Sequence, residues 1–311
     1  HDPGERRETQ VDDEDTWAKA GFNYEPVTDR AAELLAGAID MHVHIGPDSM
    51  GARRMDLLRI VLKAREARVR SLVLKSHDFP TVLLADFAQR FCEPVRIFGG
   101  ITLNPSVGGL NPAAVETSAK LGARVVWMPT RSSFRPGGNE RGRLDGTRVL
   151  DQDGNLSPQV CEILDLVKAH NLVLGTGHLP SNEVFAVVNE ANRRGIRKVL
   201  VNHPLTKATG VSLPLAEQKA LVDIGAYIEH CFVATMPCHD RLDPRTIVEA
   251  VKYVGAERSI LASDFGQLHN PDPVEGMRMF IATMLKFGVT EDDIIKMTRI
   301  NPARLLSMDE I

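Results

Sequence analysis

Eight short apolar runs, separated by longer segments of helical periodicity, constrain the fold of this chain more than any other feature. Each run is bounded by glycine, proline or asparagine and is rich in residues that favour strands. Strands that alternate with helices pair in parallel, so eight such units predict a closed (β/α)8 barrel, the TIM barrel of the α/β class. The runs are Ile39–His44, Ser71–His77, Ile97–Leu103, Arg124–Met128, Leu172–His178, Lys198–His203, Ala226–His230 and Ile260–Asp264.

The segments between these runs carry helix signals. Asn111 and Ser157 each precede a proline, an arrangement in which the polar residue caps a helix and proline occupies its first position. Gly195 is a stop signal at the end of another helical segment. An open doubly wound sheet would carry a glycine-rich phosphate loop after its first strand, but the sequence there is HVHIGPD. The pattern therefore favours the barrel over the open sheet.

The 311-residue length fits one barrel, with two unusual segments. Residues 1–25 are rich in charge, so we expect a flexible arm, followed by a single domain over 26–311. The connection at about 129–157 is long, turns at Asp153-Gly154 and is lid-like. Its arginines suit a carboxylate or phosphate, with a solvated loop as the alternative, and we expect Arg131 to bind an anionic substrate. The arginines of this loop are Arg131, Arg135, Arg141 and Arg143.

Composition argues against several classes of partner. The formal net charge is −4, which indicates no binding surface for nucleic acid or for an anionic membrane. No apolar run approaches the roughly 18 residues of a spanning helix. We expect a small-molecule substrate and a homo-oligomer, because barrels with N-terminal arms often associate. The absence of a Cys-x-x-Cys pair predicts free thiols in a reducing, cytoplasmic compartment for Cys92, Cys161, Cys231 and Cys238.

Ionisable side chains occupy the C-terminal ends of six of the eight predicted strands. These ends meet at one face of a barrel, where active sites lie. His42 and His44 are two residues apart, so both point to the barrel axis. Because imidazole and carboxylate are ligands of Zn²⁺, with Mn²⁺, Fe²⁺ or Co²⁺ as alternatives, we predict a metal held by His42, His44, His178 and Asp264. The full set is His42, His44, Lys75, His77, His178, His203, Glu229, His230 and Asp264.

These residues also lie in motifs that resemble a known family. The motifs DMHVH, TGH, NHP and ASDFG at four strand ends, with the closing MTRINPARLL, look like the amidohydrolase superfamily of metal-dependent hydrolases. The resemblance runs from about residue 36 to the end of that last motif. It implies that His42, His44 and His178 are metal ligands and that Asp264 binds metal or orients the attacking water. His203 would be a second ligand or a proton donor.

The fourth predicted strand departs from the family pattern. Binuclear members carry a bridging lysine or glutamate there, whereas this chain has Trp127 and Met128, with Met128 at the expected position of the bridge. One metal ion is therefore favoured over two. Lys75 keeps the other case open, because it could form a carbamate, bind an anionic substrate or hold a salt bridge. We place substrate or electrostatic contact first.

The expected reaction follows from the charges of these groups. With a metal-activated water, Asp264 would accept the water proton, and His203 would polarise the substrate carbonyl or protonate the leaving group. Lys75, His77 and His230 would contact substrate, since only one of Glu229 and His230 can face the axis and we expect His230. We predict hydrolysis of an amide, lactone, ester or related bond. A mononuclear decarboxylase of the same fold and a non-catalytic metal-containing barrel remain alternatives.

Overall fold

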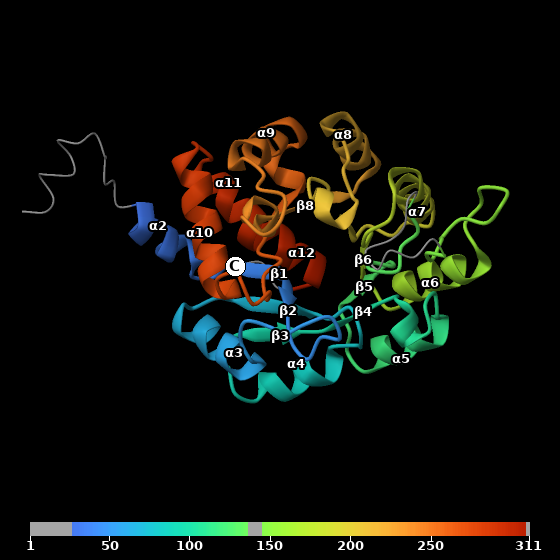
Figure 1. Cartoon of the computed structure of the whole chain (residues 1–311), viewed down its shortest axis with the longest axis horizontal. Helices are drawn as coiled ribbons and strands as arrows, with labels where there is room; N and C mark the ends of the chain where they lie inside the picture. Colours follow the sequence, from blue (N-terminus) through green and yellow to red (C-terminus); the bar gives the residue numbers. More distant parts are fainter. Residues whose placement is uncertain (1–26, 136–144, 309–311) are drawn as a thin grey trace, which may run out of the picture.

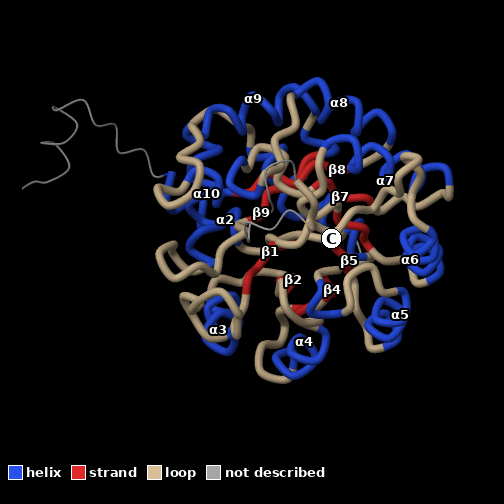
Figure 2. The backbone as a smooth tube through the Cα atoms, turned by 45° about the vertical axis from the view of Figure 1, so that its right-hand side comes forward, coloured by secondary structure: helices blue, strands red, loops and turns tan. Residues whose placement is uncertain are grey.

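Parallel strands form a ring at the centre of the computed structural model, which describes residues 27–135 and 145–308 (Figure 2). All strand pairs within this part of the chain are parallel. β3 and β4 are the two halves of one strand interrupted at Gly99, because β3 pairs with β2 and β4 pairs with β5. The strands are β1 (Ile39–His44), β2 (Ser71–Lys75), β3 (Arg96–Phe98), β4 (Gly100–Thr102), β5 (Val125–Trp127), β6 (Val173–Gly175), β7 (Val199–Val201), β8 (Tyr227–Cys231) and β9 (Ser259–Ala262).

The ring closes between β1 and the residues that follow β9. The backbone N–H of His44 donates to the carbonyl oxygen of Phe265 at 2.8 Å. The N–H of Asp264 donates to the carbonyl oxygen of His42 at 3.0 Å. These bonds complete the predicted (β/α)8 barrel, and strands overlap all eight predicted runs. Four of the strands end two or three residues earlier than predicted, so His77, His178, His203 and Asp264 lie just beyond the strand ends.

Helices surround the ring (Figures 1 and 2). The side chains of Asn111 and Ser157 accept hydrogen bonds from the first turns of α5 and α6, which confirms both predicted caps. Helix α2 packs beside α10, although the two lie at opposite ends of the sequence (Figure 1). The helices are α2 (Val27–Leu35), α3 (Leu57–Glu66), α4 (Val82–Gln89), α5 (Pro112–Lys120), α6 (Pro158–Ala169), α7 (Ser181–Arg193), α8 (Leu215–Ile224), α9 (Pro244–Val254), α10 (Pro273–Lys286), α11 (Glu291–Ile295) and α12 (Asn301–Leu306).

A bulge in β1 determines which of its side chains face the barrel axis. Ile39 and Met41 belong to the apolar cluster inside the barrel, whereas Val43 belongs to the layer between the strands and the outer helices. The pairing of β1 with β2 shifts register between Asp40 and Val43. In a regular strand, Val43 would face the axis after Ile39 and Met41. A bulge re-aims the side chains that follow it, so His42 and His44 face the axis instead.

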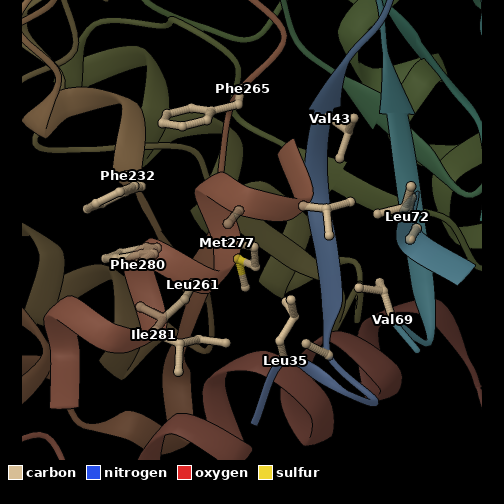
Figure 3. Packing of buried hydrophobic residues seen from close by; sticks show 14 of the residues in the cluster. Leu35, Val43, Val69, Leu72, Phe232, Leu261, Phe265, Met277, Phe280 and Ile281 are labelled. Carbon is tan, nitrogen blue, oxygen red and sulfur yellow. The ribbon is translucent and has the colours of Figure 1, made fainter. Parts of the chain in front are cut away.

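An aromatic stack outside the ring fixes the loop that carries Asp264 (Figure 3). The ring of Phe232 lies 4.9 Å from that of Phe280 and 5.9 Å from that of Phe265, measured between centroids. Helix α10 presents Gly276 to Phe265, because a Cβ at residue 276 would lie 2.3 Å from the Phe265 ring. Phe265 directly follows Asp264, so this packing holds the segment after β9 in place.

The structure also bears on several smaller predictions. The hairpin at Asp153-Gly154 is confirmed by the antiparallel bridge between Leu150 and Leu156. All four cysteines are free thiols, of which Cys92 and Cys231 are buried, Cys161 is half-buried and Cys238 is exposed. Among residues 27–135 and 145–308, no helix combines the length and apolar composition needed to cross a bilayer. The predicted arm over 1–25, together with Arg141 and Arg143, lies outside the described residues.

Candidate metal centre

His42 is the centre of a buried polar cluster at the C-terminal ends of the strands. Its Nε2 atom lies 3.3 Å from Oδ1 of Asp264 and 3.0 Å from Nζ of Lys75. Its Nδ1 atom lies 3.0 Å from Oε2 of Glu229. The His42 and Glu229 side chains are both fully buried. Groups from β1, β2, β8 and the end of β9 therefore meet at one imidazole.

Three side chains place ligand atoms close enough to share a metal ion. The Nε2 atom of His44 lies 2.9 Å from Oδ1 of Asp264, and the ligand atoms of His42, His44 and Asp264 all lie within 4.8 Å of one another. Tetrahedral zinc with bonds of about 2.0 Å requires ligand atoms about 3.3 Å apart. The donor types and their spacing therefore fit a divalent metal.

A second group that could hold a metal shares His42 and adds Glu229 and Cys231. Burial raises the pKa of the Cys231 thiol well above its ordinary value. A protonated thiol is a poor ligand, because the thiolate is the form that binds metal. The group with His44 and Asp264 is therefore the better candidate.

His178 and His203 lie beside the first two histidines. Their ring centroids are 4.9 Å apart, and the His203 ring lies 5.7 Å from that of His42. Neither belongs to a group with all its ligand atoms within 4.8 Å of one another in the described part of the chain. The structure thus brings the predicted ligand His178 to the edge of the cluster, next to His203.

The prediction that His230 faces the barrel axis is wrong, and Glu229 takes that position. Nδ2 of Asn202 donates to Oε2 of Glu229 at 2.8 Å, and the same oxygen contacts His42. His230 points to the other side of β8, where its Nε2 lies 3.3 Å from Oγ of Ser259. Side chains alternate along a strand, so the side that presents Glu229 to His42 turns His230 away.

Glu229 completes an arrangement that sequence reasoning missed. A carboxylate that binds one ring nitrogen of a histidine fixes its tautomer and leaves the other nitrogen for a metal. Burial alone would raise the pKa of Glu229, but His42 and the bond from Asn202 hold it below its ordinary value. The NHP motif was the available signal for Asn202, which directly precedes His203.

Trp127 faces the axis from β5, where Met128 was expected to stand. Trp127 belongs to the cluster inside the barrel and Met128 to a cluster outside it. The Nζ atom of Lys75, which is fully buried, lies 5.4 Å from the centroid of the Trp127 ring. The fourth strand of the ring therefore presents an indole, which is no metal ligand, next to Lys75.

Burial keeps several of the histidines neutral. It lowers the pKa of His44, His77 and His203 well below the ordinary value, and nearby positive charges act in the same direction. A neutral imidazole offers the lone pair that a metal requires. The His77 ring stacks on His44 with centroids 4.8 Å apart, and its Nδ1 lies 2.7 Å from Oγ1 of Thr130.

Two of the predicted site residues have a left-handed backbone. The φ angle is 55° at Asp264 and 30° at His203. For residues other than glycine this conformation costs about 1–3 kcal/mol and is found most often at functional sites. Each residue lies two positions beyond the end of its strand, so these turns aim the two side chains at the cluster.

A cavity of about 160 Å³ opens beside the cluster. It is lined by His44, His77, His178 and Asp264, together with Arg53 and Arg131. A larger cavity of about 550 Å³ lies between α4 and the end of α5 and contains none of the predicted site residues. The smaller cavity is therefore the candidate substrate site.

The fold is shared by solved structures that include dipeptidases, an amidohydrolase and a decarboxylase, which confirms the predicted barrel fold. Among the solved structures with this fold are the following three, all at low identity. The probable dipeptidase PvdM from Pseudomonas aeruginosa is 14% identical, with a TM-score of 0.62 over 90% of this chain and 98% of that one. The 2,6-dihydroxybenzoate decarboxylase from Rhizobium is 14% identical, with a TM-score of 0.51 over 87% and 98%. A putative 2-pyrone-4,6-dicarboxylic acid hydrolase from Pseudomonas putida is 13% identical, with a TM-score of 0.53 over 89% and 99%.

Within this fold, the chain belongs to DUF6282, a family of unknown function whose sequence model matches residues 37–229. That match runs from β1 into β8 and includes His42, His44, His178, His203 and Glu229. No curated protein matches the chain. The site itself therefore has to carry the functional interpretation.

Proposed function

We propose that this protein is a metal-dependent hydrolase acting on an amide, lactone, ester or related bond of a small, anionic substrate. The convergence of His42, His44 and Asp264 carries the proposal, because three ligand atoms meet beside a cavity open to substrate. His178 lines the same cavity and would complete the ligand set. One ion is proposed, with Zn²⁺ first and Mn²⁺, Fe²⁺ or Co²⁺ as alternatives.

The roles of the residues follow from their places. When bound, a divalent ion supplies Lewis acidity that polarises a carbonyl and activates water near neutral pH. Asp264 lines the cavity and accepts the proton of the attacking water. Nδ1 of His203 has no hydrogen-bond partner in the described part of the chain. The His203 ring lies 4.9 Å from that of His178, which lines the cavity. Because burial keeps His203 neutral, we assign its ring to polarising the substrate carbonyl rather than to protonating the leaving group.

Substrate contacts are proposed for two of the four predicted residues. His77 and Arg131 line the cavity. Lys75 is fully buried beside His42, so an electrostatic role toward His42 and Glu229 is favoured over substrate contact. Substrate contact is no longer proposed for His230, because its side chain faces away from the cluster. A cytoplasmic location and a homo-oligomer stay predictions from the sequence.

Turnover by the metal-loaded protein tests the proposal. A screen of lactones, amides and esters should show hydrolysis that Asp264→Asn abolishes and that Asp86→Asn, on the outer surface of α4, leaves unchanged. Release of CO₂ from aromatic or enoic acids, without hydrolysis, would instead establish the decarboxylase. Binding of metal without turnover of any such compound would favour the non-catalytic barrel.

A further inference from the structure

Two arginine side chains share one carboxylate at the rim of the cavity. Arg131 donates from its two terminal nitrogens to the two oxygens of Asp48, at 3.1 Å each, and Arg53 donates to the second of these oxygens. The Asp48 side chain is 3% exposed, whereas Arg53 and Arg131 both line the cavity. Asp48 therefore binds one side of each guanidinium group, and the remaining N–H groups are left for a ligand in the cavity.

The charges of this cluster are shared unequally. Arg131 has a second carboxylate, Asp78, at 3.9 Å. Asp78 is itself held by the backbone N–H and the hydroxyl of Ser49, at 2.8 and 2.9 Å. In the described part of the chain, Arg53 has an ion pair with Asp48 alone. The positive charge of Arg53 is therefore less compensated than that of Arg131.

Arg53 also keeps a donor unused. Its side chain is 9% exposed, yet its Nε has no hydrogen-bond partner among the described residues. A buried N–H without a partner is unfavourable until a ligand or water fills it. Nε–H and the second hydrogen on the nitrogen that binds Asp48 form an edge whose spacing matches the two oxygens of a carboxylate.

The position of Arg53 is fixed relative to the metal-binding cluster. Its backbone pairs with that of Gln267, and the N–H of Arg54 donates to the carbonyl oxygen of Gly266 at 2.8 Å. Both partners lie in the loop that follows Asp264. The Arg53 stem passes over Gly46, where a Cβ would lie 3.4 Å from it. The guanidinium therefore reaches the cavity from a rigid backbone.

We infer that Arg53, oriented by Asp48 and flanked by Arg131, binds the carboxylate of a small carboxylic acid substrate. The inference rests on the proposed function for the reaction that follows, but binding by Arg53 does not require it. The cavity of about 160 Å³ holds about five water molecules at ~30 Å³ each, which suits a small acid. His44 and Asp264 line the same cavity, so a carboxylate at Arg53 holds the reacting bond beside them.

Binding of succinate tests this inference, with succinamide as a neutral probe of similar shape. Dissociation constants are measured by ligand-observed NMR titration on zinc-loaded and on metal-free protein. Succinate should bind in both forms and succinamide should bind much more weakly. Arg53→Gln should weaken succinate binding about tenfold or more in both forms, because a charge-assisted pair of hydrogen bonds is lost.

Two further variants make the test specific. Arg54→Gln is the matched control, because this exposed neighbour donates to the carbonyl oxygen of Leu268 and should leave binding unchanged. Arg53→Lys keeps the charge but loses the two-donor edge, so it should also bind succinate weakly, and it replaces Arg53→Gln if that variant fails to fold. Equal succinate binding by wild type and the Arg53 variants, or equal binding of succinamide, would overturn the inference. Binding that depends on Arg53 in a protein that retains no metal would contradict the proposed function alone.

Discussion

Glu229 and His42 form a fully buried pair in which Oε2 of the carboxylate lies 3.0 Å from Nδ1 of the imidazole. The other ring nitrogen, Nε2, faces Asp264 at 3.3 Å. A charged Glu229 keeps the proton on Nδ1, so Nε2 keeps a lone pair, which faces Nζ of Lys75 at 3.0 Å in this structure and would bind the proposed metal ion. The pair therefore prepares His42 as a ligand before any ion arrives.

Replacing Glu229 by glutamine should weaken metal binding. Glu229→Gln removes the charge that fixes the His42 tautomer, and we expect a loss of about 10–100-fold in affinity. Competition with a chelator of known affinity measures the change. Glu183→Gln is the control, since Glu183 is also buried but bonds the backbone N–H of Val149 far along the chain from the cluster. Unchanged affinity in Glu229→Gln would show that the carboxylate does not act through His42.

Removing the charge of Lys75 should destabilise the metal-free protein. Lys75→Met keeps an apolar stem beside Trp127 but leaves Glu229 without a nearby buried cation, and uncompensated buried charges cost about 3–5 kcal/mol. Urea unfolding measures the difference. Lys63→Met, which removes a half-exposed pair with Asp272, should cost less than about 1 kcal/mol. If both variants lose the same small amount, Lys75 does not have the proposed electrostatic role.

His230 should make the protein sensitive to acid. Burial lowers its pKa to about 4, although Glu229 acts in the opposite direction, so the folded state holds the neutral ring. The resulting stability is fully present above the unfolded pKa of about 6.5 and is lost as pH falls toward about 4. The difference between these two pKa values corresponds to about 3 kcal/mol of unfolding free energy.

Comparison with His230→Gln isolates this contribution from that of the other buried histidines. The variant can retain a polar partner for Ser259 but has no titrating ring. Between pH 7 and pH 4, the unfolding free energy of wild type should therefore fall about 3 kcal/mol further than that of the variant. If the unfolding free energies of wild type and variant fall by the same amount, His230 is not held neutral by burial.

The aromatic stack outside the ring should be a main source of stability. Phe280 is fully buried against Phe232, so Phe280→Ala should lower the unfolding free energy by about 3–5 kcal/mol. Phe287→Ala, just after the end of α10, is the control because its side chain is 38% exposed. Denaturant unfolding of the two variants gives the comparison, and similar losses would indicate that the stack relaxes without leaving a cavity.

The sequence predicted the barrel and the meeting of its polar strand ends because both depend on local patterns. Apolar runs of strand length alternate with helical segments, and histidines follow those runs at the same end. The predicted strand Ile39–His44 matches β1 in both bounds. Asn111 and Ser157 cap their helices through short-range hydrogen bonds that the sequence contains in full.

Side-chain direction within the barrel was predicted less well, because it depends on pairing between strands. Strict alternation from Ile39 would have turned Val43 to the axis, and only the bulge in β1 brings in His42 and His44. Whether Glu229 or His230 faces the axis depends on which of the two alternating faces of β8 is turned inward. Arg53 could not be predicted either, since its place beside Asp264 comes from contacts with a loop more than 200 residues away.

Metal content is the most direct test of the central claim. Protein purified without chelators should contain close to one transition-metal ion per chain by elemental analysis. The double variant His42→Ala with His44→Ala should contain almost none, whereas His170→Ala, at the C-terminal end of α6, should keep the wild-type content. An unchanged metal content in the double variant, or a wild-type protein that holds no metal after loading, would contradict the assignment of this cluster as a metal centre.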